Sequence, residues 1–127
     1  MNKKSLNKLL IVLTSTLFLI GCGPKLEQIP QDKKIVAFGD SLTFGYGTSQ
    51  DKSYPIQLGK LINREVVNEG INGNTTRDGL NRINKVLTEH QPHTDLVSLG
   101  GNDMLRKYSV EETEKNLKEI IDTIQAK

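Results

Sequence analysis

The sequence predicts a doubly wound α/β domain, in which helices cover both faces of a parallel β-sheet. Three short segments, at residues 35–39, 65–67 and 95–99, have the length and apolar content of strands. Each is followed by a segment whose apolar residues recur at helical spacing. Strands that alternate with helices in this way are typical of a parallel sheet, which forms the middle layer of a three-layer α/β/α sandwich.

The first strand is the clearest of the three, because residues 35–39 read IVAFG and contain no polar side chain. A continuous apolar run of this length indicates a strand that is covered on both faces. The second strand, EVV at 65–67, is brief. The third, DLVSL at 95–99, comes after Pro92 and is closed by two consecutive glycines, which are typical strand and helix boundaries.

Capping residues mark where three helices begin. Ser53 with Pro55 opens one helix, and Thr75 with Asp78 three residues later indicates a capping box. Ser109 has the same spacing to Glu112 and indicates a second capping box. The apolar positions of the three helices are Ile56, Leu58, Leu61 and Ile62, then Leu80, Ile83, Val86 and Leu87, then Leu117, Ile120, Ile121 and Ile124.

Residues 1–21 have the layout of a secretory signal peptide. Three lysines, at positions 3, 4 and 8, precede a 12-residue apolar stretch from Leu9 to Ile20. A helix needs about 20 apolar residues to cross a bilayer, so this stretch is short for a permanent span. A charged start, a short apolar core and a small residue at the cleavage point are typical of export signals.

Cys22 directly follows the small residue at the end of this leader. The segment LIGC at 19–22 resembles the lipobox of bacterial lipoproteins, in which the cysteine is lipidated and becomes the new N-terminus. We expect a lipid anchor at Cys22, a polar tether over residues 22–32, and a location on the periplasmic or extracytoplasmic face of the bacterial cell envelope. The alternative is an unmodified thiol in an ordinary signal peptide. Since the chain has 1 cysteine, an intrachain disulfide is excluded.

The charge balance argues against a nucleic-acid partner. The whole chain carries 17 basic and 15 acidic residues. Residues 1–21 contain three lysines and no acid, so the remaining chain has 14 basic and 15 acidic residues. The basic excess therefore belongs to the leader, and no basic stripe of the kind that binds a phosphate backbone is left.

Clusters of glycine and polar residues follow all three predicted strands, at residues 39–41, 68–75 and 100–103. The carboxyl ends of parallel strands meet at one edge of a sheet, where folds of this class bind their ligands. A serine on a tight strand-to-helix turn exposes its hydroxyl above the sheet. Glycines let a carbonyl approach the backbone, and an asparagine amide can donate to a developing oxyanion. These features together fit acyl transfer.

The three clusters also resemble known sequence blocks. GDSLTFGYG at 39–47, NEGINGNTT at 68–76 and GGND at 100–103 are similar, in order and spacing, to the first three conserved blocks of the GDSL or SGNH hydrolase family. The resemblance runs from about residue 35 to the end of the chain. It implies a flavodoxin-like α/β/α sandwich, and it suggests small bacterial esterases of the thioesterase, lysophospholipase and arylesterase type.

The resemblance implies roles for individual residues. Ser41 matches the family's nucleophile, and its backbone N–H would be one donor of the oxyanion hole. Gly73 and Asn102 match the other two oxyanion-hole residues. Gly73 is preferred to Gly70 because of its place in the GNTT end of the second block. Asp40 is not assigned as the catalytic acid, because a triad acid must orient the histidine and not the serine.

The family's base and acid come from a D-x-x-H block near the C-terminus, and this sequence contains no D-x-x-H. Its two histidines, His90 and His93, precede the third strand and so belong to the opposite edge of the sheet. That strand is about 16 Å long, whereas a base must come within about 3.2 Å of the nucleophile. A metal pair at H-x-x-H is an alternative. With Pro92 between the two histidines and few acids nearby, we expect solvated loop histidines and no metal site.

Residues 33–127 are therefore expected to be the N-terminal part of an SGNH hydrolase domain, truncated after its third strand and the following helix. A gene fragment, a frameshift and a natural short form are all compatible with this expectation.

The predicted function is that of an exported, lipid-anchored serine esterase or lipase, which hydrolyses carboxylic esters or thioesters through an acyl-enzyme. This short form is expected to be inactive, because Ser41 has no histidine base. The expected partners are a small ester or acyl substrate and, through Cys22, a membrane, and no cofactor is expected. The alternatives are a non-catalytic ligand-binding lipoprotein and a product without function.

Overall fold

The computed structural model describes residues 28–127, and the middle layer of the fold is a parallel sheet of three strands. The strands are β1 (Ile35–Gly39), β2 (Val66–Gly70) and β3 (Thr94–Ser98), in the order β2-β1-β3. In the register of the sheet, Gly39 at the end of β1 pairs with Gly70 of β2 and with Ser98 of β3. The predicted leader (1–21) and Cys22 lie outside the described residues.

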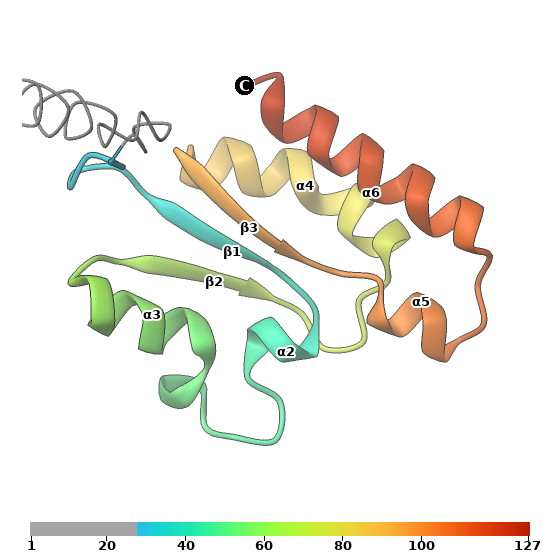
Figure 1. The fold of residues 1–127 in the computed structure, drawn as a ribbon, viewed down its shortest axis with the longest axis horizontal. Helices are drawn as coiled ribbons and strands as arrows, with labels where there is room; N and C mark the ends of the chain where they lie inside the picture. The colour runs from blue at the N-terminus through green and yellow to red at the C-terminus, as the bar shows by residue number, and fades with distance from the viewer. Residues whose placement is uncertain (1–27) are drawn as a thin grey trace, which may run out of the picture.

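Helices cover both faces of this sheet (Figure 1). α4 (Thr76–His90) and α6 (Val110–Gln125) pack side by side on one face, and α3 (Tyr54–Ile62) packs on the other. The same part of the chain contains three short helices, which are α2 (Ser41–Phe44), a 3-10 helix at Gln50–Lys52, and α5 (Gly101–Leu105). None of the helices in residues 28–127 has both the length and the apolar character of a membrane span. The prediction of a doubly wound α/β/α sandwich is confirmed.

Alternate residues of β1 point to opposite faces of the sheet, because successive side chains of a strand point in opposite directions. Val36 and Phe38 form one core with α4 and α6, together with Ile83, Val86, Leu87 and Ile120. Ile35 and Ala37 form the other core with Val66, and Leu58 of α3 packs against it. All five residues of β1 are buried, which explains why its sequence is a continuous apolar run.

The structure extends the second predicted strand. β2 ends at Gly70 and not at Val67, because Asn68 and Glu69 continue the pairing with β1 although their side chains are polar. The Asn68 amide Nδ2 donates to the Ser53 hydroxyl at 3.2 Å. Ser53 precedes α3 as predicted, but its side chain makes no cap hydrogen bond to that helix. β3 begins and ends one residue earlier than predicted.

The two predicted capping boxes differ in outcome. At the start of α4, the Thr75 hydroxyl accepts from the Asp78 N–H at 3.3 Å and the Asp78 carboxylate accepts from the Thr75 N–H at 2.9 Å, so this box is complete. At the start of α6, the Ser109 hydroxyl accepts from the Glu112 N–H at 3.1 Å. The Glu112 carboxylate does not complete that box, because it pairs with Arg77 of α4 instead.

Candidate active site

The three polar clusters that follow the strands gather at one edge of the sheet. β1, β2 and β3 run parallel and end in register, so the residues after Gly39, Gly70 and Ser98 leave the sheet side by side. Ser41, Gly73 and Asn102 belong to these three segments. The structure therefore brings together the regions that the sequence analysis assigns to one site, while the role of each residue stays a prediction.

Ser41 is the first residue of the four-residue helix α2, directly after β1. Asp40 caps this helix, since its carboxylate Oδ1 accepts from the Leu42 N–H at 3.0 Å. The helix ends after one turn, because Gly45 adopts the left-handed conformation and its N–H donates to the Ser41 carbonyl at 3.0 Å. Ser41 is half-buried on this tight turn. A tight strand-to-helix turn of this kind is where a nucleophilic serine is expected, because it exposes the hydroxyl above the sheet.

Gly73 lies in the loop between β2 and α4 with a φ of 78°, a conformation that L side chains rarely adopt. Its carbonyl accepts from the guanidinium Nη2 of the exposed Arg106 at 2.9 Å. No acceptor within residues 28–127 takes the Gly73 N–H. By contrast, the Gly70 N–H already donates to the Asn68 side chain at 2.9 Å. Of these two glycines, Gly73 is the one whose N–H has no acceptor among the described residues, and its role as an oxyanion donor stays a prediction.

Asn102, the second residue of α5, connects the three clusters. Its amide Nδ2 donates to the Asn74 carbonyl at 2.9 Å and makes a longer contact of 3.4 Å with the Asp40 carboxylate Oδ2. The first bond is of ordinary strength and the second is weak. The Asn102 amide is therefore oriented from two sides, and its weakly held hydrogen can be given to a substrate oxygen.

Asp103 is a buried neighbour of Asn102 whose contacts are not evident from the sequence. It is 2% exposed, and its carboxylate accepts from the Thr76 N–H at 2.9 Å and from the Thr76 hydroxyl at 2.6 Å. The Asn116 amide of α6 donates to the same hydroxyl at 3.1 Å. These bonds tie α5, which carries Asn102, to the beginning of α4. The GGND block shows an acid at this position, but only the fold reveals its partner.

The two histidines have different surroundings, and one of them corrects an expectation. His93 follows α4, and its backbone N–H donates to the Lys34 carbonyl at 3.0 Å, at the amino ends of the strands. His90, however, is not a solvated loop residue. It is the last residue of α4, its side chain is 17% exposed, and its Nε2 lies 2.7 Å from Glu69 Oε1. Within residues 28–127, no group of three or more His, Cys, Asp or Glu side chains is arranged to bind a metal.

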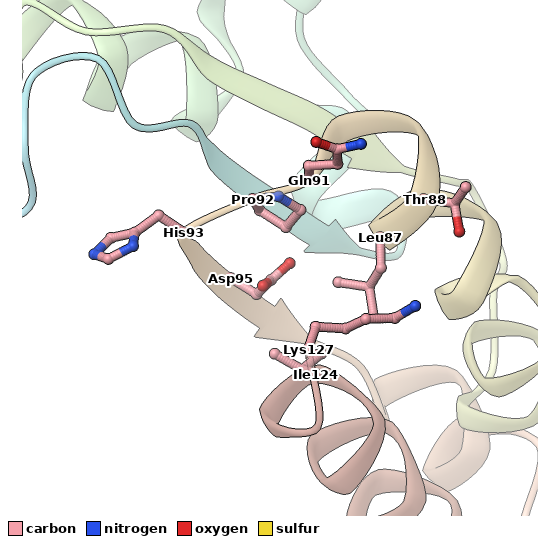
Figure 2. Close-up of a pocket in the computed structure, with 8 residues that line it drawn as sticks. All are labelled: Leu87, Thr88, Gln91, Pro92, His93, Asp95, Ile124 and Lys127. Atoms are coloured by element: carbon pink, nitrogen blue, oxygen red, sulfur yellow. The ribbon is translucent and has the colours of Figure 1, made fainter.

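A hollow between the start of β3 and the ends of α4 and α6 lies at this opposite edge (Figure 2). The Asp95 carboxylate points into it, whereas the His93 ring points away from it (Figure 2). Asp95 Oδ1 is buried and has no hydrogen-bond partner in the part of the chain that the structure describes. Burial raises the pKa of Asp95 above its ordinary value.

Asp95→Asn is expected to stabilise the fold at pH 7, by less than about 1 kcal/mol. The folded state raises the pKa of Asp95, so it disfavours the ionised carboxylate, and this penalty is fully present above the folded pKa. The gain should disappear as the pH falls below the unfolded pKa, where both states are protonated. Urea unfolding from pH 3 to pH 7 tests this. The exposed Asp122→Asn should show no such gain, and a gain at Asp95 that does not vary with pH would contradict the explanation.

Comparison with known proteins supports the assignment of the fold and the blocks. The sequence model of the GDSL-like lipase/acylhydrolase family matches residues 37–127. Thioesterase 1/protease 1/lysophospholipase L1 of Escherichia coli K12 is 38% identical over 94 residues, which are 72% of this chain and 45% of that protein. The arylesterase of Vibrio mimicus is 35% identical over 98 residues, which are 73% of this chain and 49% of that protein.

Solved structures give the same result. AlinE4, an esterase of the SGNH-hydrolase family, superposes with a TM-score of 0.72 at 39% identity, over 78% of this chain and 56% of that one. TesA superposes with a TM-score of 0.72 at 28% identity, over 74% of this chain and 55% of that one. The chain spans about half the length of the relatives that it matches. From its fold, its three sequence blocks and these comparisons, the chain belongs to the GDSL-like lipase/acylhydrolase family.

Proposed function

We propose that this chain carries the nucleophile and the oxyanion hole of a serine hydrolase that acts on carboxylic esters or thioesters. The observation that carries the proposal is the position of the Asn102 amide, between the Asn74 carbonyl beside Gly73 and the Asp40 carboxylate beside Ser41. Three segments far apart in the sequence thus meet around one small region. The names of the relatives, which include an esterase, a thioesterase and an arylesterase, support the same chemistry.

In the proposed reaction, the Ser41 hydroxyl attacks the carbonyl carbon of the substrate and gives its proton to a base. The carbonyl oxygen becomes an oxyanion, which accepts hydrogen bonds from the Ser41 N–H, the Gly73 N–H and the Asn102 amide. Collapse of this intermediate expels the alcohol or thiol and leaves an acyl-enzyme. Water then releases the acid and restores Ser41.

The base is the part of this machinery that the sequence does not supply. The chain has two histidines, of which one is bound to Glu69 and the other lies at the amino ends of the strands. A serine hydroxyl without a base is a weak nucleophile. We therefore propose that the chain by itself hydrolyses esters slowly, and that a base from outside this sequence is needed for full activity.

Imidazole in solution can replace a missing histidine, so it provides the test. The rate of p-nitrophenyl butyrate hydrolysis is measured for the wild type and for Ser41→Ala at increasing imidazole concentrations. A positioned base contributes about 10²–10⁴-fold, and a dissolved one recovers part of this. We expect the difference in hydrolysis rate between the wild type and Ser41→Ala to grow about tenfold as imidazole is added. We also expect mass spectrometry to detect a butyryl group on Ser41.

Ser41→Ala also serves as the control, because imidazole itself hydrolyses this ester. Equal rates for both proteins at every imidazole concentration would contradict the proposal. Stabilisation of the wild type by short-chain carboxylic acids, without any turnover that depends on Ser41, would instead favour the ligand-binding alternative.

The location of the protein is a separate proposal, supported by the sequence alone. The LIGC segment at 19–22 and the charged, apolar leader before it favour a lipid anchor at Cys22 in the bacterial cell envelope. Such an anchor would hold the protein at a membrane surface, where acyl substrates are concentrated.

A further inference from the structure

Arg82 is the most extensively bonded arginine in the described chain, and it lies close to the candidate site. It belongs to the middle of α4, and its side chain is 15% exposed. The guanidinium carbon lies 4.0 Å from the centre of the Phe38 ring of β1, which is a cation–π arrangement. An arginine that is buried to this extent has lost most of its water, so its partners determine what it does.

The partners of Arg82 come from the ends of two strands and from the loop that follows one of them. Nη2 donates to the Gly39 carbonyl at 2.8 Å and to the Glu69 carbonyl at 3.0 Å. Nε donates to the Asn74 side chain Oδ1 at 2.8 Å. Nη1 lies 3.5 Å from the Glu69 carboxylate, whose other oxygen is held by His90. Burial lowers the pKa of Arg82, but a guanidinium keeps its proton in proteins.

Two of these partners are neighbours of the residues that the proposed reaction uses. Gly39 is two residues before Ser41, and its carbonyl also accepts from the Ile71 N–H at 3.1 Å. Asn74 directly follows Gly73, and its carbonyl orients the Asn102 amide at 2.9 Å. One planar side chain thus connects the serine turn with the loop of the oxyanion donors.

We propose that Arg82 is a positioning residue, which fixes the turn that carries Ser41 relative to the oxyanion donors Gly73 and Asn102. The inference rests on the proposed function for its catalytic consequence. A displacement of about 1 Å between nucleophile and oxyanion donors can cost about 100-fold in rate. Lysine cannot replace Arg82 fully, because an ammonium group lacks the planar fork that reaches three acceptors at fixed angles.

The experiment compares Arg82→Met and Arg82→Lys with a matched control, Arg77→Met. Arg77 lies on the same helix, but its side chain is 68% exposed and its partner is Glu112 of α6. For each protein, kcat and KM for p-nitrophenyl butyrate are measured with imidazole, after subtraction of the Ser41→Ala rate and correction for the folded fraction. The amide signals of Ser41 and Gly73 and the Asn102 side-chain signal are followed by NMR.

For Arg82→Met we expect kcat to fall about 100-fold with little change in KM, because Arg82 does not touch the substrate. The three NMR signals should move, and Arg82→Lys should recover part of the rate. Arg77→Met should leave both readouts unchanged. A folded Arg82→Met protein with wild-type kcat and unmoved signals would overturn the inference, and so would equal changes in Arg77→Met.

Asn74→Ala is the second variant, in case Arg82→Met does not fold. It removes the acceptor of Arg82 Nε but keeps the carbonyl that holds Asn102. We expect a loss of about tenfold in kcat and a shift of the Asn102 signal, and an unchanged rate and signal would argue against the inference. If the wild type shows no turnover that depends on Ser41, the proposed function fails. The NMR comparison then decides by itself whether Arg82 fixes the geometry.

Discussion

Asp103→Ala is expected to lower the free energy of unfolding by about 4 kcal/mol. Asp103 is 2% exposed, and its two carboxylate oxygens accept from the N–H and the hydroxyl of Thr76. The substitution leaves both donors buried without an acceptor, and it also removes packed atoms. Urea unfolding followed by circular dichroism measures the loss, since the chain contains no tryptophan for fluorescence.

Two further variants make this result specific. Asp122→Ala removes an exposed carboxylate that bonds to Lys118 at 2.7 Å, and it should cost less than about 0.5 kcal/mol. Asp103→Asn keeps the shape of the side chain but places an amide nitrogen opposite a donor, so we expect about half of the loss. If Asp103→Ala were no more destabilising than Asp122→Ala, the junction between α4 and α5 would not depend on this carboxylate.

The sequence predicted the sheet and the meeting of the three polar clusters at one edge of it, for a clear physical reason. Residues 35–39 are apolar throughout because β1 is central and covered on both faces. The carboxyl ends of neighbouring parallel strands must lie at one edge, so the polar residues after each strand could be placed together without coordinates. The meeting of the Ser41, Gly73 and Asn102 segments follows from this topology.

The short elements and the polar contacts could not be predicted in the same way. α2 and α5 have four and five residues, which is too short for an apolar period to be visible. α2 is stabilised by the Asp40 cap and by packing. Likewise, Asn68 and Glu69 do not read as strand residues, and they are accommodated in β2 because Ser53 and His90 bind their side chains.

Arg82 illustrates the same limit within a helix that was predicted correctly. Its neighbours Leu80 and Ile83 mark the apolar face of α4, and by periodicity alone Arg82 is one polar residue among several. Its acceptors Gly39 and Asn74 lie 43 and 8 positions away. Only the tertiary structure reveals that one side chain joins these segments.

Gly70→Ala is expected to destabilise the fold by about 3 kcal/mol or more, because the new methyl group has no space. Gly70 is the last residue of β2, and a Cβ atom at this position would overlap the backbone of Thr43 and Phe44 in α2. Backbone atoms cannot rotate away as a flexible side chain can. The turn that carries Ser41 must therefore move, or β2 must separate from it, and either change also displaces the candidate nucleophile.

Gly101→Ala is the matched control for this steric argument. Gly101 starts α5, and a Cβ atom there would have Asp40 Oδ2 at 3.7 Å as its nearest neighbour, which is an ordinary contact. Its backbone is compatible with alanine, so we expect a change within about 1 kcal/mol, in the stabilising direction if any. Urea unfolding of both variants tests the difference. If Gly70→Ala were as stable as Gly101→Ala, the close packing of α2 on β2 would not hold, and the position of Ser41 would not depend on Gly70.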